Sequence, residues 1–245
     1  MVPKGFLKIL HSVDSTNNYA MAQLHAGMAS HGMAWFAHEQ IAGKGQRGKT
    51  WETEAGKNIV MSLILQLNML NSSQQFYLSA MLAEACYDFF WSYAGDETKI
   101  KWPNDLFWRD RKAGGVLIET IFHGKYWKWA VIGIGININQ TDFNPILKNP
   151  ISLKQITGKE FDTVRLATEL YELIIEKTKL LETKSFDKII ESYNQHLYKR
   201  NQFVKLKKGD LLFETSIQGV SAEGKLFTED VVERKFDFEE VEWLL

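Results

Sequence analysis

The segment KWPNDLFWRDRKAGGVLIE, residues 101–119, carries the strongest structural signal in this chain. Pro103, Asn104 and Asp105 form a turn signature between two short apolar stretches, which predicts a β-hairpin. Lys112 stands just before a pair of glycines and the apolar run that follows them. This arrangement predicts a buried strand with an ammonium group at its entrance, where a pocket poor in water strengthens its field on a phosphate. The alternative interpretation is a surface hairpin with an ordinary lysine.

Strand and helix patterns alternate on both sides of this segment. Apolar runs predict strands at Phe6–His11, Met33–Glu39, Asn58–Leu67, Thr98–Trp102 and Leu106–Trp108. A β-hairpin with its turn at 123–125 is expected from Gly115–Phe122 and Tyr126–Ile138. Helices are expected after Asp14–Asn17 and over Gln74–Tyr93, Val164–Leu181 and Phe186–Leu197, with a short element at Leu153–Ile156. This order predicts an α+β domain with a mixed, largely antiparallel sheet and helices on one face.

The pattern changes from residue 203 onward. Glycines separate a series of short strand candidates, namely Phe203–Leu206, Leu211–Ile217, Lys225–Phe227 and Val231–Phe236. Such closely spaced short strands predict a small C-terminal SH3-like β-barrel. The expected domains are therefore residues 1–200, large enough to hold a pocket, and residues 201–245.

Composition excludes several classes of protein. The formal net charge of -1 over 245 residues gives no general basic surface, so no nucleic-acid partner is expected. Cys86 is the only cysteine, which excludes an intrachain disulfide and a cysteine-based zinc site. The N-terminus is too short and polar for a secretion signal, and no apolar stretch approaches the ~18 residues of a membrane span. We therefore expect a cytoplasmic protein without a membrane partner.

Residues 43–48, GKGQRG, satisfy the pattern G-x-G-x-x-G. In a dinucleotide-binding site this loop opens a helix whose N-terminus meets the pyrophosphate. Here a strand candidate follows the loop, so we reject a dinucleotide site. What remains is a glycine loop carrying Lys44, Arg47 and Lys49, which suits the neutralisation of a phosphate or carboxylate. For the loop taken alone, a solvated turn with incidental charge is the alternative.

Four motifs in one order connect these features. They are DSTN at 14–17, EQIAGKGQRGKTW at 39–51, KWPND…RKAGGVLIE at 101–119 and IGIGIN at 132–137. With the small C-terminal β-domain, they make the chain resemble the biotin protein ligases, the catalytic part of the biotin operon repressor family. The resemblance covers nearly the whole chain.

The resemblance implies an enzyme that joins biotin and ATP into biotinyl-5'-AMP. It then transfers biotin to a lysine of the biotin carboxyl carrier domain of a biotin-dependent carboxylase. ATP and Mg²⁺ are expected as co-substrate and activator, without a tightly bound cofactor, and a homodimer is compatible with the resemblance. Three alternatives stay open: a lipoate–protein ligase, a non-catalytic binder of biotin or a nucleotide, and a DNA-binding repressor. A repressor needs a helix-turn-helix domain, and we do not expect one in the few residues before Phe6.

The resemblance also implies a role for each matching side chain. Biotin binding is expected from Ser15, Thr16, Asn17, Gln40, Lys44, Gly45, Gln46, Lys112, Gly114 and Gly115. Binding of ATP and the adenylate is expected from Arg47, Trp51, Asn104, Lys112, Gly135 and Asn137. Catalysis is expected from Lys112, Arg47 and Asp105, and Asp105 is also the expected Mg²⁺ ligand.

The loop departs from the family's pattern, which often reads G-R-G-R-R-G-R. Lys44, Gln46 and Lys49 stand where that pattern has arginine. Lysine keeps the charge but loses the two-pronged guanidinium, and glutamine loses the charge altogether. We expect either weaker retention of the adenylate or compensation by Arg47 and Lys44.

Overall fold

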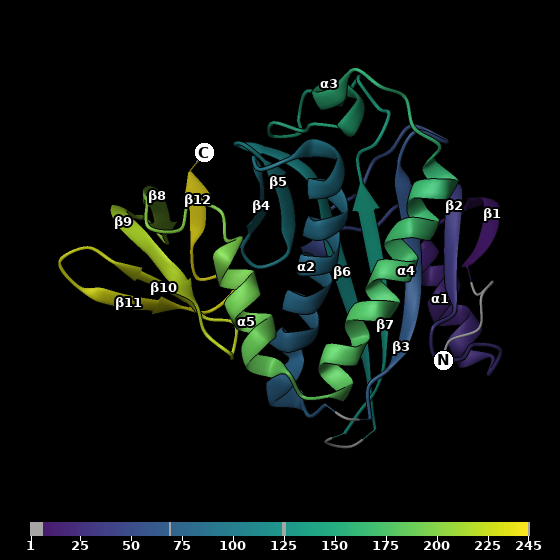
Figure 1. The fold of residues 1–245 in the computed structure, drawn as a ribbon, viewed down its shortest axis with the longest axis horizontal. Helices are drawn as coiled ribbons and strands as arrows, with labels where there is room; N and C mark the ends of the chain where they lie inside the picture. Colours follow the sequence, from purple (N-terminus) through teal and green to yellow (C-terminus); the bar gives the residue numbers. More distant parts are fainter. Residues whose placement is uncertain (1–6, 69, 124–125, 245) are drawn as a thin grey trace.

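The computed structural model describes residues 7–244 except residues 69, 124 and 125. Its main sheet has seven strands in the order β1-β2-β3-β7-β6-β5-β4 (Figure 1). Their bounds are β1 Leu7–Val13, β2 Ala34–Gln40, β3 Ile59–Gln66, β4 Thr98–Lys101, β5 Asp105–Trp108, β6 Arg111–His123 and β7 Tyr126–Ile136. Only the β1–β2 pair is parallel among the described strands of this sheet. The prediction of an α+β fold with a mixed, largely antiparallel sheet is therefore confirmed.

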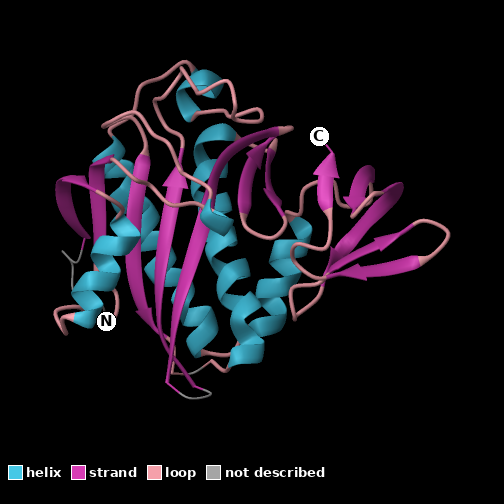
Figure 2. Ribbon diagram, turned by 180° about the vertical axis from the view of Figure 1, so that it is seen from behind, coloured by secondary structure: helices cyan, strands magenta, loops and turns pink. Residues whose placement is uncertain are grey.

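Helices cover both faces of this sheet, so the prediction of helices on one face is wrong. In Figure 1, α4 lies in front of the central strands, and Figure 2 shows α1 on the opposite side. The helices are α1 Thr16–His25, α2 Gln75–Ala94, α3 Leu153–Thr157, α4 Thr163–Glu182 and α5 Phe186–Gln195. The short element expected near residue 153 is α3. No helix of the described residues is long and apolar enough to cross a membrane.

The strand β3 explains why both faces need a cover. Residues 59–65 are all buried, and alternate side chains of a strand point to opposite faces. Leu63 and Leu65 join the large core under α2 and α4, whereas Ile64 packs with Trp35 and Val131 on the α1 side. A continuous apolar run of this kind is typical of a strand covered on both sides, and it could have indicated the second layer.

Three glycines gather on the α1 face at the centre of the sheet. Gly133 of β7 lies opposite Ser62 of β3, and Gly135 of β7 lies opposite Gly115 of β6. Because alternate residues share a face, these positions lie on the same side as Ile64. The sheet therefore has a glycine floor, defined as Gly115, Gly133 and Gly135, where backbone replaces side chains. The β6–β7 turn expected at 123–125 includes residues 124 and 125, which lie outside the described residues.

The C-terminal residues form a second, five-stranded antiparallel sheet in the order β11-β10-β9-β8-β12. Its strands are β8 Phe203–Lys208, β9 Leu211–Val220, β10 Leu226–Glu229, β11 Glu233–Phe236 and β12 Glu242–Leu244. The sequence did not predict β12. Within the described residues the outer strands β11 and β12 do not pair, so the sheet is open and does not show the closed SH3-like barrel that was expected. The division into domains at residues 200 and 201 stays a prediction.

The turn between β4 and β5 is held by two other parts of the fold. Tyr193 of α5 donates its hydroxyl hydrogen to the Pro103 carbonyl at 2.8 Å. The Trp102 indole Nε1–H donates to the carbonyl of Gly224, in the turn before β10, at 2.9 Å. Tyr193 is completely buried. The C-terminal sheet and α5 thus fix the position from which Asp105 projects.

Cys86 lies in the core on α2, as a buried thiol. Its burial raises the pKa of the thiol to about 12. A thiol with so high a pKa stays protonated at neutral pH and is a poor nucleophile. Cys86 is therefore a structural residue, in line with its apolar sequence neighbours.

Candidate active site

The glycine floor is covered by two side chains from distant parts of the chain. A Cβ atom at Gly133 would lie 2.4 Å from Asn17 Oδ1, and one at Gly135 would lie 2.4 Å from Trp51 Cε2. Only glycine lets these side chains rest directly on the strand backbone. Asn17 and Trp51 therefore mark the two ends of one site on the α1 face of the sheet.

A buried hydrogen-bond network occupies the Asn17 end. The Thr16 backbone N–H and hydroxyl both donate to Gln40 Oε1, at 2.7 and 3.0 Å. Ser62 Oγ lies 2.7 Å from Thr16 Oγ1 and 2.5 Å from Asn17 Oδ1, so its single hydroxyl hydrogen serves this pair of oxygens. Ser15 precedes them as the N-cap residue of α1 and is also buried. We call Ser15, Thr16, Asn17, Gln40 and Ser62 the ring-binding group, after the role that the resemblance implies for the first four of them.

The hydrogen-bond inventory of Gln40 shows what this end can offer a ligand. Its Oε1 already accepts twice from Thr16, which uses both lone pairs of a carbonyl oxygen. Its Nε2 lies close to Gly43, where a Cβ atom would approach it to 2.7 Å. Gln40 therefore presents N–H donors, which suit the carbonyl oxygen of a cyclic urea or amide.

Glu119 of β6 connects this network to the glycine loop. Its Oε2 accepts from Asn17 Nδ2 at 2.8 Å, and its Oε1 lies 3.9 Å from the Lys44 Nζ. Glu119 is the last residue of the segment 101–119, and no role was predicted for it from the sequence. Ser62 was also missed, although it is the one polar residue within the apolar run 59–65 and could have been noticed there.

The loop folds back on itself and contacts β6. Lys44 and Thr50 form an isolated antiparallel bridge. Gln46 Nε2 donates to the Val116 carbonyl at 3.4 Å, so the uncharged amide is engaged with the sheet backbone. Gly45 is half-buried beside it. The side chain of Arg47 lies outside the part of the chain that the structure describes, so its expected contact with the adenylate stays a prediction.

Lys112 and Asp105 form an ion pair on the Trp51 side of the floor. Their Nζ and Oδ1 atoms are 2.6 Å apart, and the side chains are 35% and 28% exposed. The Lys112 Nζ also lies 6.0 Å from the centre of the Trp51 ring. The Trp51 Nε1–H is buried without a hydrogen-bond partner, which is a costly state that a ligand atom could relieve. The site thus places an ammonium group and an unpaired indole N–H next to each other, beside a flat aromatic ring.

Lys101 adds a second amine near this pair that sequence reasoning did not assign. Burial lowers its pKa, Asp105 opposes that shift and Lys112 adds to it. Its Nζ lies 5.2 Å from the centre of the Phe107 ring and 5.4 Å from that of Trp243, in the C-terminal sheet. The amine is therefore held between aromatic faces at the junction of the two sheets.

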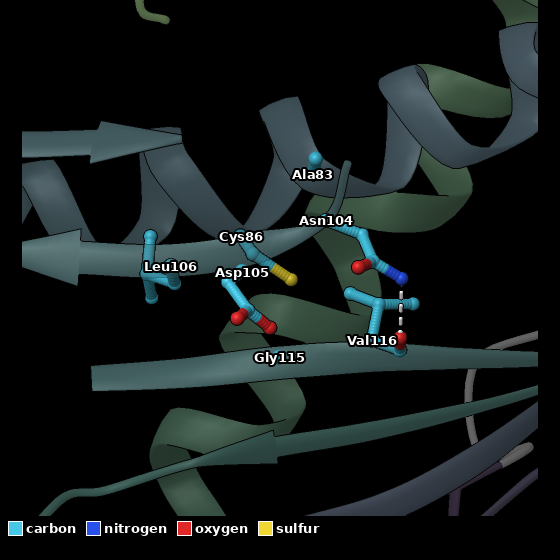
Figure 3. A pocket seen from close by; sticks show the side chains of 7 residues that line it. All are labelled: Ala83, Cys86, Asn104, Asp105, Leu106, Gly115 and Val116. Carbon is cyan, nitrogen blue, oxygen red and sulfur yellow. Dashed lines mark hydrogen bonds between the residues drawn. The ribbon is translucent and has the colours of Figure 1, made fainter. Parts of the chain in front are cut away.

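Asn104, Gly114 and Asn137 were expected to face the ligand, but they face other parts of the protein. Figure 3 shows the Asn104 amide directed at the Val116 carbonyl, at 2.6 Å, beside a small hollow under α2, while Asp105 lies by Gly115. Gly114 lies opposite Ile136, on the core face. The Asn137 amide donates to the Ile151 carbonyl at 3.1 Å. These residues shape the walls of the site through the backbone, and their assigned ligand contacts stay predictions.

A metal would have few protein ligands here. Within the described residues, no group of three or more His, Cys, Asp and Glu side chains is placed to hold one. Asp105 supplies one carboxylate, already paired with Lys112. Mg²⁺ often binds through one or two carboxylates together with the phosphates of a substrate. Asp105 alone would therefore need further ligands from a bound molecule to hold such an ion.

A family model for the biotin/lipoate A/B protein ligase family matches residues 9–137, which contain the ring-binding group, the loop, the Lys112–Asp105 pair and the glycine floor. The chain belongs to this family. The matched region ends where β7 ends, so the family model covers the described site but not the C-terminal sheet.

Individual relatives agree with this family. The chain is 27% identical over 227 residues to the bifunctional ligase/repressor BirA of Escherichia coli K12, covering 92% of this chain and 70% of that protein. It is 34% identical over 163 residues to the biotin–[acetyl-CoA-carboxylase] ligase of Paracoccus denitrificans, covering 63% of this chain and 65% of that protein. The biotin protein ligase from Aquifex aeolicus in complex with biotin and ATP has the same fold, with a TM-score of 0.81 at 24% identity. That alignment covers 97% of this chain and 98% of the other.

Proposed function

We propose that this chain is a biotin–protein ligase. It forms biotinyl-5'-AMP from biotin and ATP and then transfers biotin to a lysine of a biotin carboxyl carrier domain. The observation that carries the proposal is the two-ended site over the glycine floor. One end presents amide and hydroxyl groups that suit the ureido ring of biotin, and the other presents Lys112 and Trp51.

The first step joins two anions, so the site must offset their repulsion. The biotin carboxylate attacks the α-phosphorus of ATP, and pyrophosphate leaves. Lys112, partly shielded from water, stabilises the charge that builds on the phosphate oxygens, and Lys44 neutralises charge from the loop side. Holding the ring at one end and the nucleotide at the other aligns the reacting atoms, an effect that reaches roughly 7–11 kcal/mol in well-oriented systems.

The second step needs no nucleophile from the protein. The neutral amine of the acceptor lysine attacks the carbonyl carbon of the mixed anhydride, an amide bond forms, and AMP leaves with the electrons of the broken C–O bond. The proton that the nitrogen loses as the amide forms passes to solvent. Asp105 is the carboxylate next to Lys112, and we assign it the role of orienting the incoming amine.

The physiological setting follows from the proposed activity. Asp105 would be the protein residue that holds Mg²⁺, and the ion would supply positive charge to the phosphates of ATP. The acceptor is a carrier domain of a biotin-dependent carboxylase, so we place the protein in the cytoplasm. A homodimer is compatible with this activity.

Substrate choice tests the proposal, because the family includes both biotin and lipoate ligases. Exchange of labelled pyrophosphate into ATP should depend on biotin and should not occur with lipoate at the same concentration. The donors of Gln40 and the Asn17 amide would have no ureido group to bind in lipoate. Exchange that lipoate supports as well as biotin would contradict the assignment.

The loop at residues 43–50 should become protected when the substrates bind. Its lysines and Thr50 are exposed and make few contacts, so the free enzyme should be cut by trypsin there. Biotin with ATP and Mg²⁺ should slow that cleavage at least several-fold, because the loop closes over the adenylate. The control is the exposed turn at Lys208 and Gly209, far along the C-terminal sheet, where the cleavage rate should not change. Equal rates in the loop with and without ligands would count against closure.

A further inference from the structure

We propose that Glu119 is a positioning residue that couples the ring-binding group to the glycine loop. One of its carboxylate oxygens orients the Asn17 amide, and the other anchors Lys44. The inference deepens the proposed function and rests on it, since the ligand at the Asn17 end is taken to be biotin. It assigns a role to a side chain that does not itself touch the reacting atoms.

The orientation of the Asn17 amide follows from what surrounds it. An ionised carboxylate only accepts hydrogen bonds, so Glu119 attracts the Nδ2–H₂ group of Asn17 and repels its Oδ1. The amide oxygen is thereby turned to the Ser62 hydroxyl on the other side. Asn17 is 2% exposed, so water cannot offer it alternative partners. Without Glu119 the amide would lose the group that distinguishes its two ends.

The same carboxylate faces the loop. Lys44 Nζ and Glu119 Oε1 are 3.9 Å apart, and their side chains are 45% and 34% exposed. An ion pair with this exposure adds little to the stability of the fold. It can still favour one position of the loop, because a glycine-rich segment at the surface needs only a small energy to be held in place. The Gln46 amide adds a second contact to β6, at the Val116 carbonyl.

The Lys44–Glu119 pair matters more in this chain because the loop departs from the arginine-rich pattern of the family. The residue that would carry a further positive charge is Gln46, which binds backbone and attracts no anion. Among the described side chains of the loop, Lys44 is the one that brings a positive charge to β6. Its acidic partner there is Glu119. A movement of the loop would also shift the Glu119 carboxylate, which accepts the hydrogen bond from the Asn17 amide. Biotin binding and loop position should accordingly be linked through one side chain.

Two substitutions separate the two contacts. Glu119→Gln keeps an amide oxygen that can accept from Asn17 and removes the charge that attracts Lys44. Glu119→Ala removes both contacts. Glu214→Gln is the matched control, since Glu214 is also a strand glutamate paired with a lysine, Lys205 at 3.6 Å, but lies in the C-terminal sheet. The readouts are the KM for biotin, the KM for ATP and the rate of tryptic cleavage in the loop without ligands.

Glu119→Ala should raise the KM for biotin about tenfold, the size expected for losing a charge-assisted hydrogen bond, while the KM for ATP stays within about twofold. Glu119→Gln should keep the KM for biotin within about threefold of the wild type and raise loop cleavage as much as Glu119→Ala does. Glu214→Gln should change none of the three. Such a split between two variants at one position would not result from a general loss of packing.

The inference is overturned if Glu119→Ala leaves the KM for biotin unchanged, or if Glu119→Gln leaves loop cleavage at the wild-type rate. It is also overturned if the KM values for biotin and ATP rise together, as expected for a merely structural role. Lack of biotin-dependent pyrophosphate release by the wild-type enzyme would instead contradict the proposed function. The cleavage rates, which need no substrate, would then still decide whether Glu119 anchors the loop.

Discussion

Lys112→Ala should lower biotin-dependent pyrophosphate release by about 10²–10³-fold, the loss measured when a single group that stabilises transition-state charge is removed. The Lys112 ammonium is the cation that lies beside both Trp51 and Asp105, so no other described side chain replaces it in that position. Without it, Asp105 also remains as an unpaired negative charge near the site of attack by another anion. The KM for biotin should change less than kcat, because the ring is bound at the other end of the floor.

The matched control for this variant is Lys199→Ala. Lys199 is 32% exposed and pairs with Asp110 at 3.0 Å, a setting close to that of Lys112 but away from the glycine floor. Lys199→Ala should retain activity, and both variants should keep the thermal midpoint of unfolding within a few degrees, because partly exposed ion pairs contribute little to stability. Near-normal pyrophosphate release by Lys112→Ala would overturn the role given to this lysine.

Gly135→Ala should raise the dissociation constant for ATP at least tenfold while leaving biotin binding nearly intact. Its Cβ would lie 2.4 Å from Trp51 Cε2 and 2.5 Å from Trp51 Nε1, so the whole indole must move off the floor. Overpacking of this kind typically costs ~1–3 kcal/mol, and here the cost falls on the aromatic side chain expected to bind ATP. Isothermal titration with ATP and with biotin would measure the two affinities separately.

Gly133→Ala provides the opposite pattern and serves as the comparison. Its Cβ would lie 2.4 Å from Asn17 Oδ1, so the displaced side chain belongs to the ring-binding group. This variant should weaken biotin binding more than ATP binding. If both substitutions weakened both ligands equally, the division of the floor into a biotin end and a nucleotide end would be wrong.

The order of strands and helices in the main sheet could be predicted because each element carries its own periodicity. The hairpin of β6 and β7 and the long helix α2 are examples, with bounds that differ from the predictions by a few residues. The second helical layer could not be predicted in this way, because which face α1 covers depends on the chain direction after β1. The buried run of β3 was the available signal, and it indicates a cover on both sides.

The sequence predicted many of the residues of the candidate site but not how the strands arrange them on one face of the sheet. Thr16, Asn17 and Gln40 do meet, and Lys112 does meet Asp105 and Trp51. The register between β7 and its neighbours brings Ser62 and Glu119 into the same site, and register cannot be read from a single strand. Gly114 lies on the core face because successive residues of a strand alternate between faces, and its neighbour Gly115 lies on the α1 face. Asn104 faces the core because its amide binds the backbone of β6.

The departure in the loop also gains a physical meaning from the structure. Gln46 makes a contact that an uncharged donor can make with the Val116 carbonyl, whereas an arginine would bring a charge to a backbone already bound by Asn104. Weaker retention of the adenylate and compensation by Lys44 and Arg47 both stay predictions. If compensation occurs, we expect the coupling proposed for Glu119 to contribute to it.

The most direct test of the central claim is the intact mass of a carrier domain after incubation with the enzyme, ATP, Mg²⁺ and biotin. We predict one added biotin on a single lysine of the carrier domain, dependent on ATP and lost when the enzyme carries Lys112→Ala. A carrier domain whose mass is unchanged by the wild-type enzyme would contradict the account, and so would one that gains lipoate as readily when lipoate replaces biotin in the incubation.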